Sequence, residues 1–123
     1  GYFSDLPIPG GGTSHYIKSA TSADLLTWNV ESGTRISLGE QPCAFMHSDG
    51  STTLFYFKAQ STEPRLYYAT ASDGLTFSTE VQSTINGNGP DILQLQDGSY
   101  LLYYDTSGSD GEFYVGAARM TID

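Results

Sequence analysis

Basic residues, histidine and cysteine are scarce in this chain of 123 residues, and each shortage limits what the protein can do. Five lysines and arginines stand against 14 acidic residues, which gives a net charge of −9. This charge disfavours nucleic acids and anionic membranes as partners. With two histidines, a protein-built metal site has weak support, and bound calcium is a weak alternative to a protein without cofactors. The single cysteine, Cys43, excludes an intrachain disulfide and is expected to be a buried apolar residue.

Long apolar runs are absent as well, and no stretch of about ten residues or more combines helical periodicity with helix caps. The sequence therefore predicts no membrane span and almost no helix, and it shows no signal peptide from which localisation could be read. Short alternating runs between turn residues predict an all-β protein instead.

The chain contains an internal repeat. Residues 20–28 return as 69–77, with Asp24 matching Asp73 49 residues later. A second landmark, Pro42, returns 48 residues later as Pro90, and an Asp-Gly-Ser turn follows each copy. A period of this size, made of strand-like runs and turns, predicts a propeller-type array in which each repeat is one small sheet.

Grouping the predicted strands gives about two and a half four-stranded antiparallel blades, which would be half of a β-propeller if the ring has five blades. Residues 14–36 supply the last two strands of one blade, 42–83 a complete blade, and 90–119 three strands of a further blade. A closed ring needs more repeats, so we expect either a piece of a longer protein or copies that assemble. Unpaired sheet edges at both ends predict a homodimer or strand exchange between copies. The strands themselves are expected at 16–20, 28–36, 44–47, 53–59, 66–71, 77–83, 92–95, 100–105 and 112–119.

Two motifs carry a family resemblance. Gly-Pro-Asp-Ile at 89–92, followed by Gln-Asp-Gly-Ser-Tyr-Leu-Leu-Tyr-Tyr at 96–104, resembles the start of a blade in five-bladed propeller glycoside hydrolases of the arabinanase and β-xylosidase type. Asp-Leu-Leu-Thr-Trp at 24–28 resembles a turn in those enzymes and in the related invertase and levanase type. The resemblance covers most of residues 15–120. It implies a neutral polysaccharide of the arabinan or xylan type as substrate and favours a secreted or periplasmic protein.

The resemblance also implies three carboxylates at the inner mouth of the ring. An inverting glycosidase needs a general acid and a general base that stand well apart, so that water can attack from the opposite face. Glu40, in Glu40-Gln41-Pro42, resembles the family's general acid, with Gln41 in place of glycine. Asp91 is the candidate base or orienting carboxylate. The family's base lies in an Asp-Pro pair near the N-terminus, which is missing here, and Asp5 is its nearest substitute.

Trp28, His47 and Tyr104 are the candidate residues for binding the carbohydrate. The position of Trp28 in the repeat is occupied by Phe77 in the second copy. An aromatic residue at the same position of each blade favours packing between blades, unless Trp28 is exposed. His47 ends a first strand near the expected axis. Tyr104 is one of nine tyrosines in the chain. These side chains are expected either to line a sugar-binding groove or to cover the faces of the sheets.

Two hypotheses about function therefore stand side by side. In the first, the protein is an inverting glycosidase that uses Glu40 and Asp91. In the second, Glu40 is a solvated loop acid, Asp91 caps a turn, and the chain is a non-catalytic carbohydrate-binding or assembly module. The aspartates of the repeated turns are structural under both hypotheses: Asp24, Asp49, Asp73 and Asp97.

Overall fold

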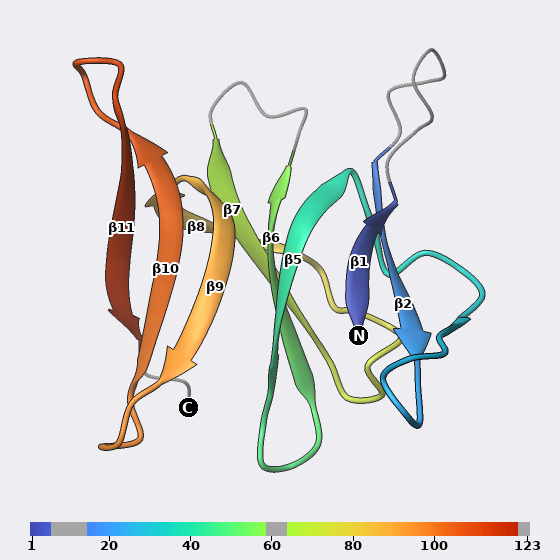
Figure 1. Ribbon diagram of the computed structural model, residues 1–123. Helices are drawn as coiled ribbons and strands as arrows, with labels where there is room; N and C mark the ends of the chain where they lie inside the picture. The colour runs from blue at the N-terminus through green and yellow to red at the C-terminus, as the bar shows by residue number, and fades with distance from the viewer. Residues whose placement is uncertain (6–14, 59–63, 121–123) are drawn as a thin grey trace.

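The computed structural model describes residues 1–5, 15–58 and 64–120. Throughout these ranges the chain forms strands and turns, arranged as three antiparallel sheets that stand side by side (Figure 1). The expected all-β architecture is confirmed. The described part of the chain contains no helix that is long and apolar enough to cross a membrane.

Each sheet is built from consecutive strands. The first sheet holds β1 (Tyr2–Asp5), β2 (Tyr16–Thr21), β3 (Asn29–Val30) and β4 (Ile36–Ser37). The second has the order β5-β6-β7-β8, with β5 (Gly39–Met46), β6 (Thr52–Lys58), β7 (Arg65–Ala71) and β8 (Val81–Asn86). The third holds β9 (Asn88–Gln94), β10 (Tyr100–Ser107) and β11 (Phe113–Met120).

The sequence repeat is visible in the strand register. Cys43 of β5 lies opposite Phe55 of β6, and 48 residues later Asp91 of β9 lies opposite Tyr103 of β10. The turn after β2 likewise matches the turn after β7. In these turns the side chains of Asp24 and Asp73 each accept backbone N–H bonds from the residues two and three positions later. These bonds lower the pKa of both carboxyls.

The second sheet has a hydrophobic cluster on each face. Because alternate residues of a strand point to opposite faces, Leu54 and Tyr56 of β6 pack toward the first sheet, against Ile17 and Ile36. Phe55 packs toward the third sheet with Leu66 and Leu102. The three sheets are thus held together by two cores that share the second sheet.

Several elements differ from the sequence-based expectation. The strand expected at 28–36 is two short strands, β3 and β4, because Gly33 turns the chain between them with φ of 85°. The strand expected at 77–83 begins later, as β8. β1 was not expected, and it pairs with β2, so the first sheet starts before residue 14. Residue 14, the expected start of the first blade portion, and Ala59, the expected end of a strand, lie outside the described residues.

Candidate functional site

The ends of three strands, one from each sheet, meet at one end of the molecule. These are the C-terminal end of β1 and the N-terminal ends of β5 and β9, at the top of Figure 1. Asp5 ends β1, Glu40 and Gln41 lie at the start of β5, and Asp91 lies in the middle of β9; together with His15, which precedes β2, we call them the strand-end cluster. It therefore includes all three of the carboxylates predicted to be catalytic.

Two matching β-bulges shape this cluster. β5 has one extra residue relative to β6 between Glu40 and Cys43, and β9 has one extra residue relative to β10 between Asn88 and Asp91. In both bulges a residue in the left-handed region precedes a proline: Gln41 has φ of 51° and Gly89 has φ of 55°. A bulge bends the strand and redirects the neighbouring side chains. The x-Pro sequences thus set the direction of the flanking acids.

Hydrogen bonds between sheets fix the two bulges. The backbone N–H of Gln41 donates to Ser4 Oγ at 2.8 Å, which joins the second sheet to the first. The backbone N–H of Gly89 donates to Gln41 Oε1 at 2.9 Å, which joins the third sheet to the second. Both bonds involve the residue with positive φ. The relative position of the three strand ends is therefore set by specific polar contacts as well as by packing.

Glu40 and Asp5 each lie beside a basic side chain. Glu40 Oε1 is 2.6 Å from His15 Nδ1, and the Glu40 side chain is 18% exposed. His15 Nδ1 is buried and has no hydrogen-bond partner among the described residues, so its contact with Glu40 is an ion pair only when the imidazole is protonated. Asp5 Oδ2 is 2.6 Å from Lys18 Nζ of the neighbouring strand β2. Glu40 is thus the more enclosed carboxylate, whereas Asp5 belongs to a half-exposed ion pair.

Asp91 of β9, in the third sheet, faces Cys43 of β5, in the second sheet. Its Oδ1 is 3.7 Å from Cys43 Sγ, within reach of a weak S–H donor. Burial raises the pKa of the Cys43 thiol to about 11, and the charge of Asp91 adds to this increase. Cys43 is three residues from Glu40 along β5, a separation of roughly 10 Å in an extended strand. Glu40 thus contacts His15 beside the first sheet, whereas Asp91 of the third sheet contacts Cys43.

The three predicted carbohydrate-binding residues lie in three different parts of the structure. Trp28 is 47% exposed and lines a shallow apolar hollow on the first sheet with Phe3 and Val30. His47 follows the opposite end of β5 from Glu40. Tyr104 packs in the cluster between the second and third sheets, and a Cβ at Gly116 would lie 2.5 Å from its ring. Trp28 and His47 thus lie away from the strand-end cluster, whereas Tyr104 of β10 lies opposite the Gly89–Pro90 bulge, beside the Tyr103–Asp91 pair.

Sequence reasoning missed the contributions of His15 and Gln41. His15 was considered only as one of two histidines, and its contact with Glu40 depends on how the first two sheets pack. Gln41 carried a usable signal, because it replaces glycine in the Glu-Gly-Pro pattern and occupies a conformation that favours glycine.

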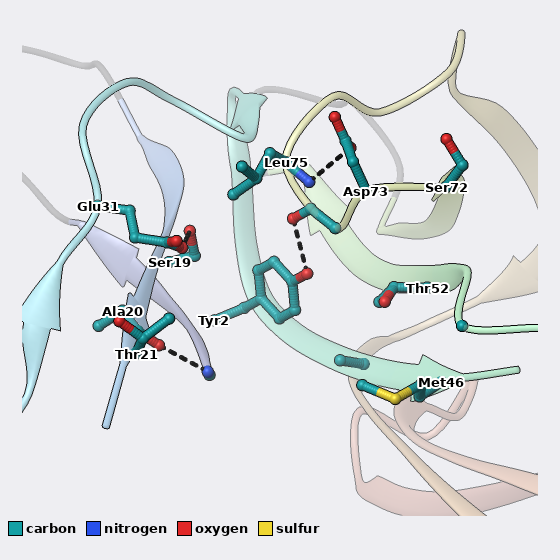
Figure 2. Close-up of a pocket in the computed structure, with 14 residues that line it drawn as sticks. Tyr2, Ser19, Ala20, Thr21, Glu31, Met46, Thr52, Ser72, Asp73 and Leu75 are labelled. Atoms are coloured by element: carbon teal, nitrogen blue, oxygen red, sulfur yellow. Dashed lines mark hydrogen bonds between the residues drawn. The ribbon is translucent and has the colours of Figure 1, made fainter. Parts of the chain in front are cut away.

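A groove of about 530 Å³ lies between the first and second sheets (Figure 2). Tyr2 crosses it and donates its hydroxyl hydrogen to the Gly74 carbonyl at 2.8 Å. Ser19 Oγ donates to Glu31 Oε2 at 2.5 Å, and Asp73 is engaged by the turn amides described above. These bonds link several of the polar groups of the groove to one another and to the neighbouring turn.

In the described ranges no group of three or more histidine, cysteine, aspartate or glutamate side chains could hold a metal ion. No protein-family model matches the chain, and no curated protein is similar to it in sequence. The crystal structure of a protein of unknown function from Dyadobacter fermentans DSM 18053 is similar in fold, with a TM-score of 0.66 at 17% identity. The match covers 89% of this chain and 34% of that one, so the present chain spans about a third of its neighbour's length. At this identity the likeness concerns the fold alone.

Proposed function

We propose that this chain is a portion of a five-bladed β-propeller of the glycoside-hydrolase type, which hydrolyses or binds a neutral polysaccharide such as arabinan or xylan. Three consecutive antiparallel sheets, with the middle one packed on both faces, are compatible with successive blades. The fold likeness to a chain about three times as long is also compatible with a larger ring.

The observation that carries the proposal is that Glu40 and Asp91 do not recur in the repeat. Aspartates with a structural role do recur, and their copies make the same turn bonds: Asp24 with Asp73, and Asp49 with Asp97. By contrast, the position of Glu40 is occupied by Asn88 in the third sheet, and the position of Asp91 by Cys43 in the second. The repeated scaffold itself thus does not require these two acids, and this supports a role for them in function.

The chemistry follows from two separated carboxylates. In an inverting glycosidase the acid protonates the leaving oxygen while the base activates a water on the opposite face of the sugar. Glu40, the more enclosed of the two carboxylates, is the candidate acid. Asp91, which is exposed, can reach a water and suits the base. Asp5 is held by Lys18 and suits an orienting role better than proton transfer.

The second candidate is a non-catalytic module that binds the same polysaccharide or serves in assembly. It is favoured by the engagement of all three acids: Glu40 contacts His15, Asp5 contacts Lys18, and Asp91 Oδ1 accepts the backbone N–H of Ile92 at 3.0 Å. These contacts stabilise charge within the protein and need no substrate.

Assays on arabinan, xylan and nitrophenyl glycosides separate the two candidates. For an enzyme we expect Glu40→Gln and Asp91→Asn each to lower the rate by about 10² to 10⁴-fold. Asp97→Asn, which changes a turn aspartate, is the matched control and should leave the rate unchanged. Binding without hydrolysis by the unmodified chain would select the non-catalytic module. Neither binding nor hydrolysis of any of these substrates would overturn the proposal.

A further inference from the structure

A second groove, of about 510 Å³, lies between the second and third sheets at the end opposite to the strand-end cluster. It is formed where the β5–β6 and β9–β10 hairpins lie, at the bottom of Figure 1. Phe45, His47, Asp49, Gln94 and Tyr100 are among the residues that line it, and we call it the hairpin groove. His47 is seven residues beyond Glu40, so roughly 20 Å of extended chain separates the two ends.

Three rings form one wall of the hairpin groove. Phe45 meets His47 at a centroid distance of 4.9 Å and Tyr100 at 4.5 Å, both in edge-to-face geometry. Such contacts hold each ring in a fixed orientation. Because the rings come from both sheets, the groove offers a preformed aromatic surface for an apolar face of a ligand.

The polar groups of the groove are oriented by bonds within the protein that leave other atoms available. His47 Nε2 is hydrogen-bonded to Thr53 Oγ1 at 2.7 Å, so Nδ1 on the other edge of the ring is available to a ligand. Gln94 Nε2 donates to Tyr100 Oη at 3.1 Å, which leaves the Gln94 carbonyl as an acceptor and the Tyr100 hydroxyl as a donor. The N–H and Oγ–H of Ser51 both donate to Asp49 Oδ1, so Asp49 Oδ2 is available as an acceptor. The groove thus presents both hydrogen-bond donors and acceptors.

The residues of the hairpin groove, like the two acids of the strand-end cluster, do not recur in the repeat. The positions of Phe45 and His47 are taken by leucines in the third sheet, Leu93 and Leu95. The positions of Gln94 and Tyr100 are taken by Met46 and Thr52 in the second sheet. Only Asp49 has a like counterpart, Asp97, which forms the same turn bonds. The fold therefore does not require this combination of aromatic and polar groups.

We propose that the hairpin groove is a second carbohydrate-binding site, which takes a neutral sugar unit of the polysaccharide on the aromatic wall. Donors and acceptors beside aromatic rings match a sugar ring, which carries hydroxyls on its rim and C–H groups on its face. No lysine or arginine lines the groove and Asp49 does, so uronic and sialic acids are disfavoured. The choice of a neutral sugar rests on the proposed function, whereas the location of the site does not.

Titration with xylo- and arabino-oligosaccharides, followed by amide chemical shifts, tests this site. We expect shifts at His47, Gln94 and Tyr100, and about fivefold to tenfold weaker binding in Gln94→Ala, which loses one amide partner. Gln96→Ala, an exposed glutamine of the same hairpin, is the matched control and should bind normally. Because Tyr100→Ala removes a packed ring, Tyr100→Phe, which removes the hydroxyl alone, is the second test and should also weaken binding.

The outcomes distinguish the second site from the proposed function. Groove shifts that persist in Glu40→Gln show a site separate from the strand-end cluster. Shifts confined to Glu40 and Asp91 would overturn the second site and leave the proposed function intact. Binding of tetramethylammonium but of no sugar at the groove would overturn the carbohydrate assignment, because Asp49 and the rings would then be serving a cation.

Discussion

Gln41 Oε1 accepts the backbone N–H of Gly89 at 2.9 Å, and this bond joins the same position of two successive repeats. Gln41 and Gly89 each precede a proline in a bulge, and each has a positive φ. A side chain of one repeat thus satisfies the backbone of the next at the point where Glu40 and Asp91 are positioned.

We expect Gln41→Ala to destabilise the protein and Gln41→Gly to be close to neutral. Alanine loses the bond to Gly89, worth about 1 kcal/mol, and keeps the left-handed backbone. Glycine loses the same bond but relieves backbone strain of about 1–2 kcal/mol. Urea unfolding of both variants measures the difference, with Gln96→Ala as control. An alanine variant as stable as the glycine variant would show that the backbone of residue 41 is not strained.

Cys43 should react unusually slowly with iodoacetamide, because the thiolate is the reactive form and the pKa of this thiol is raised to about 11. At pH 8 only about one native thiol in a thousand is ionised, so alkylation of the native chain should be about 100-fold slower than in urea. The same shift weakens the fold as pH rises from about 9, where the unfolded thiol ionises, toward about 11.

Asp91→Asn tests whether Cys43 and Asp91 are neighbours, as the 3.7 Å separation indicates. Removing the carboxylate charge lowers the pKa of the thiol, so alkylation at pH 8 should become faster. Asp97→Asn should leave the rate unchanged. An equal rate in Asp91→Asn and the unmodified chain would place Asp91 away from the thiol.

Tyr104 is expected to act through packing, and Gly116 provides the test. A Cβ at residue 116 would lie 2.5 Å from two ring atoms of Tyr104, so Gly116→Ala should cost about 1–3 kcal/mol in the free energy of unfolding. Tyr104→Leu in the same chain should recover part of this loss. Ala117→Ser, at the exposed neighbouring position, is the control. Additive effects of the two substitutions would show that the ring and residue 116 do not touch.

The sequence was most informative where structure is local. The Asp-Gly turns, the hairpins they close and the capping roles of Asp24 and Asp73 depend on neighbouring residues, and all were predicted. β1 was missed because four residues give too short an alternation to recognise. The contact of His15 with Glu40 and the bond from Gly89 to Gln41 join different sheets, so they depend on tertiary packing that the alternation pattern does not contain.

The edge strand β11 carries the features expected of a self-association surface. Within the described ranges it pairs only with β10, and Phe113, Tyr114 and Val115 at its start are 85%, 48% and 72% exposed. The second half of the strand is small, with glycine at 116 and alanine at 117 and 118. An unpaired apolar edge favours pairing with another strand.

We expect β11 to pair with β11 of a second copy, antiparallel and centred on Gly116. In this register Tyr114 faces Ala118 of the partner and Val115 faces Ala117, so large residues oppose small ones. Phe113 then faces Arg119, and a guanidinium beside a ring is favourable.

Light scattering should give twice the chain mass of 13.3 kDa at micromolar concentration. Val115→Lys should restore the monomer, because lysine blocks edge pairing, whereas Leu26→Lys, at an exposed apolar turn residue, should not. If the unmodified chain is monomeric, β11 does not pair with β11 of a second copy and this expectation is wrong.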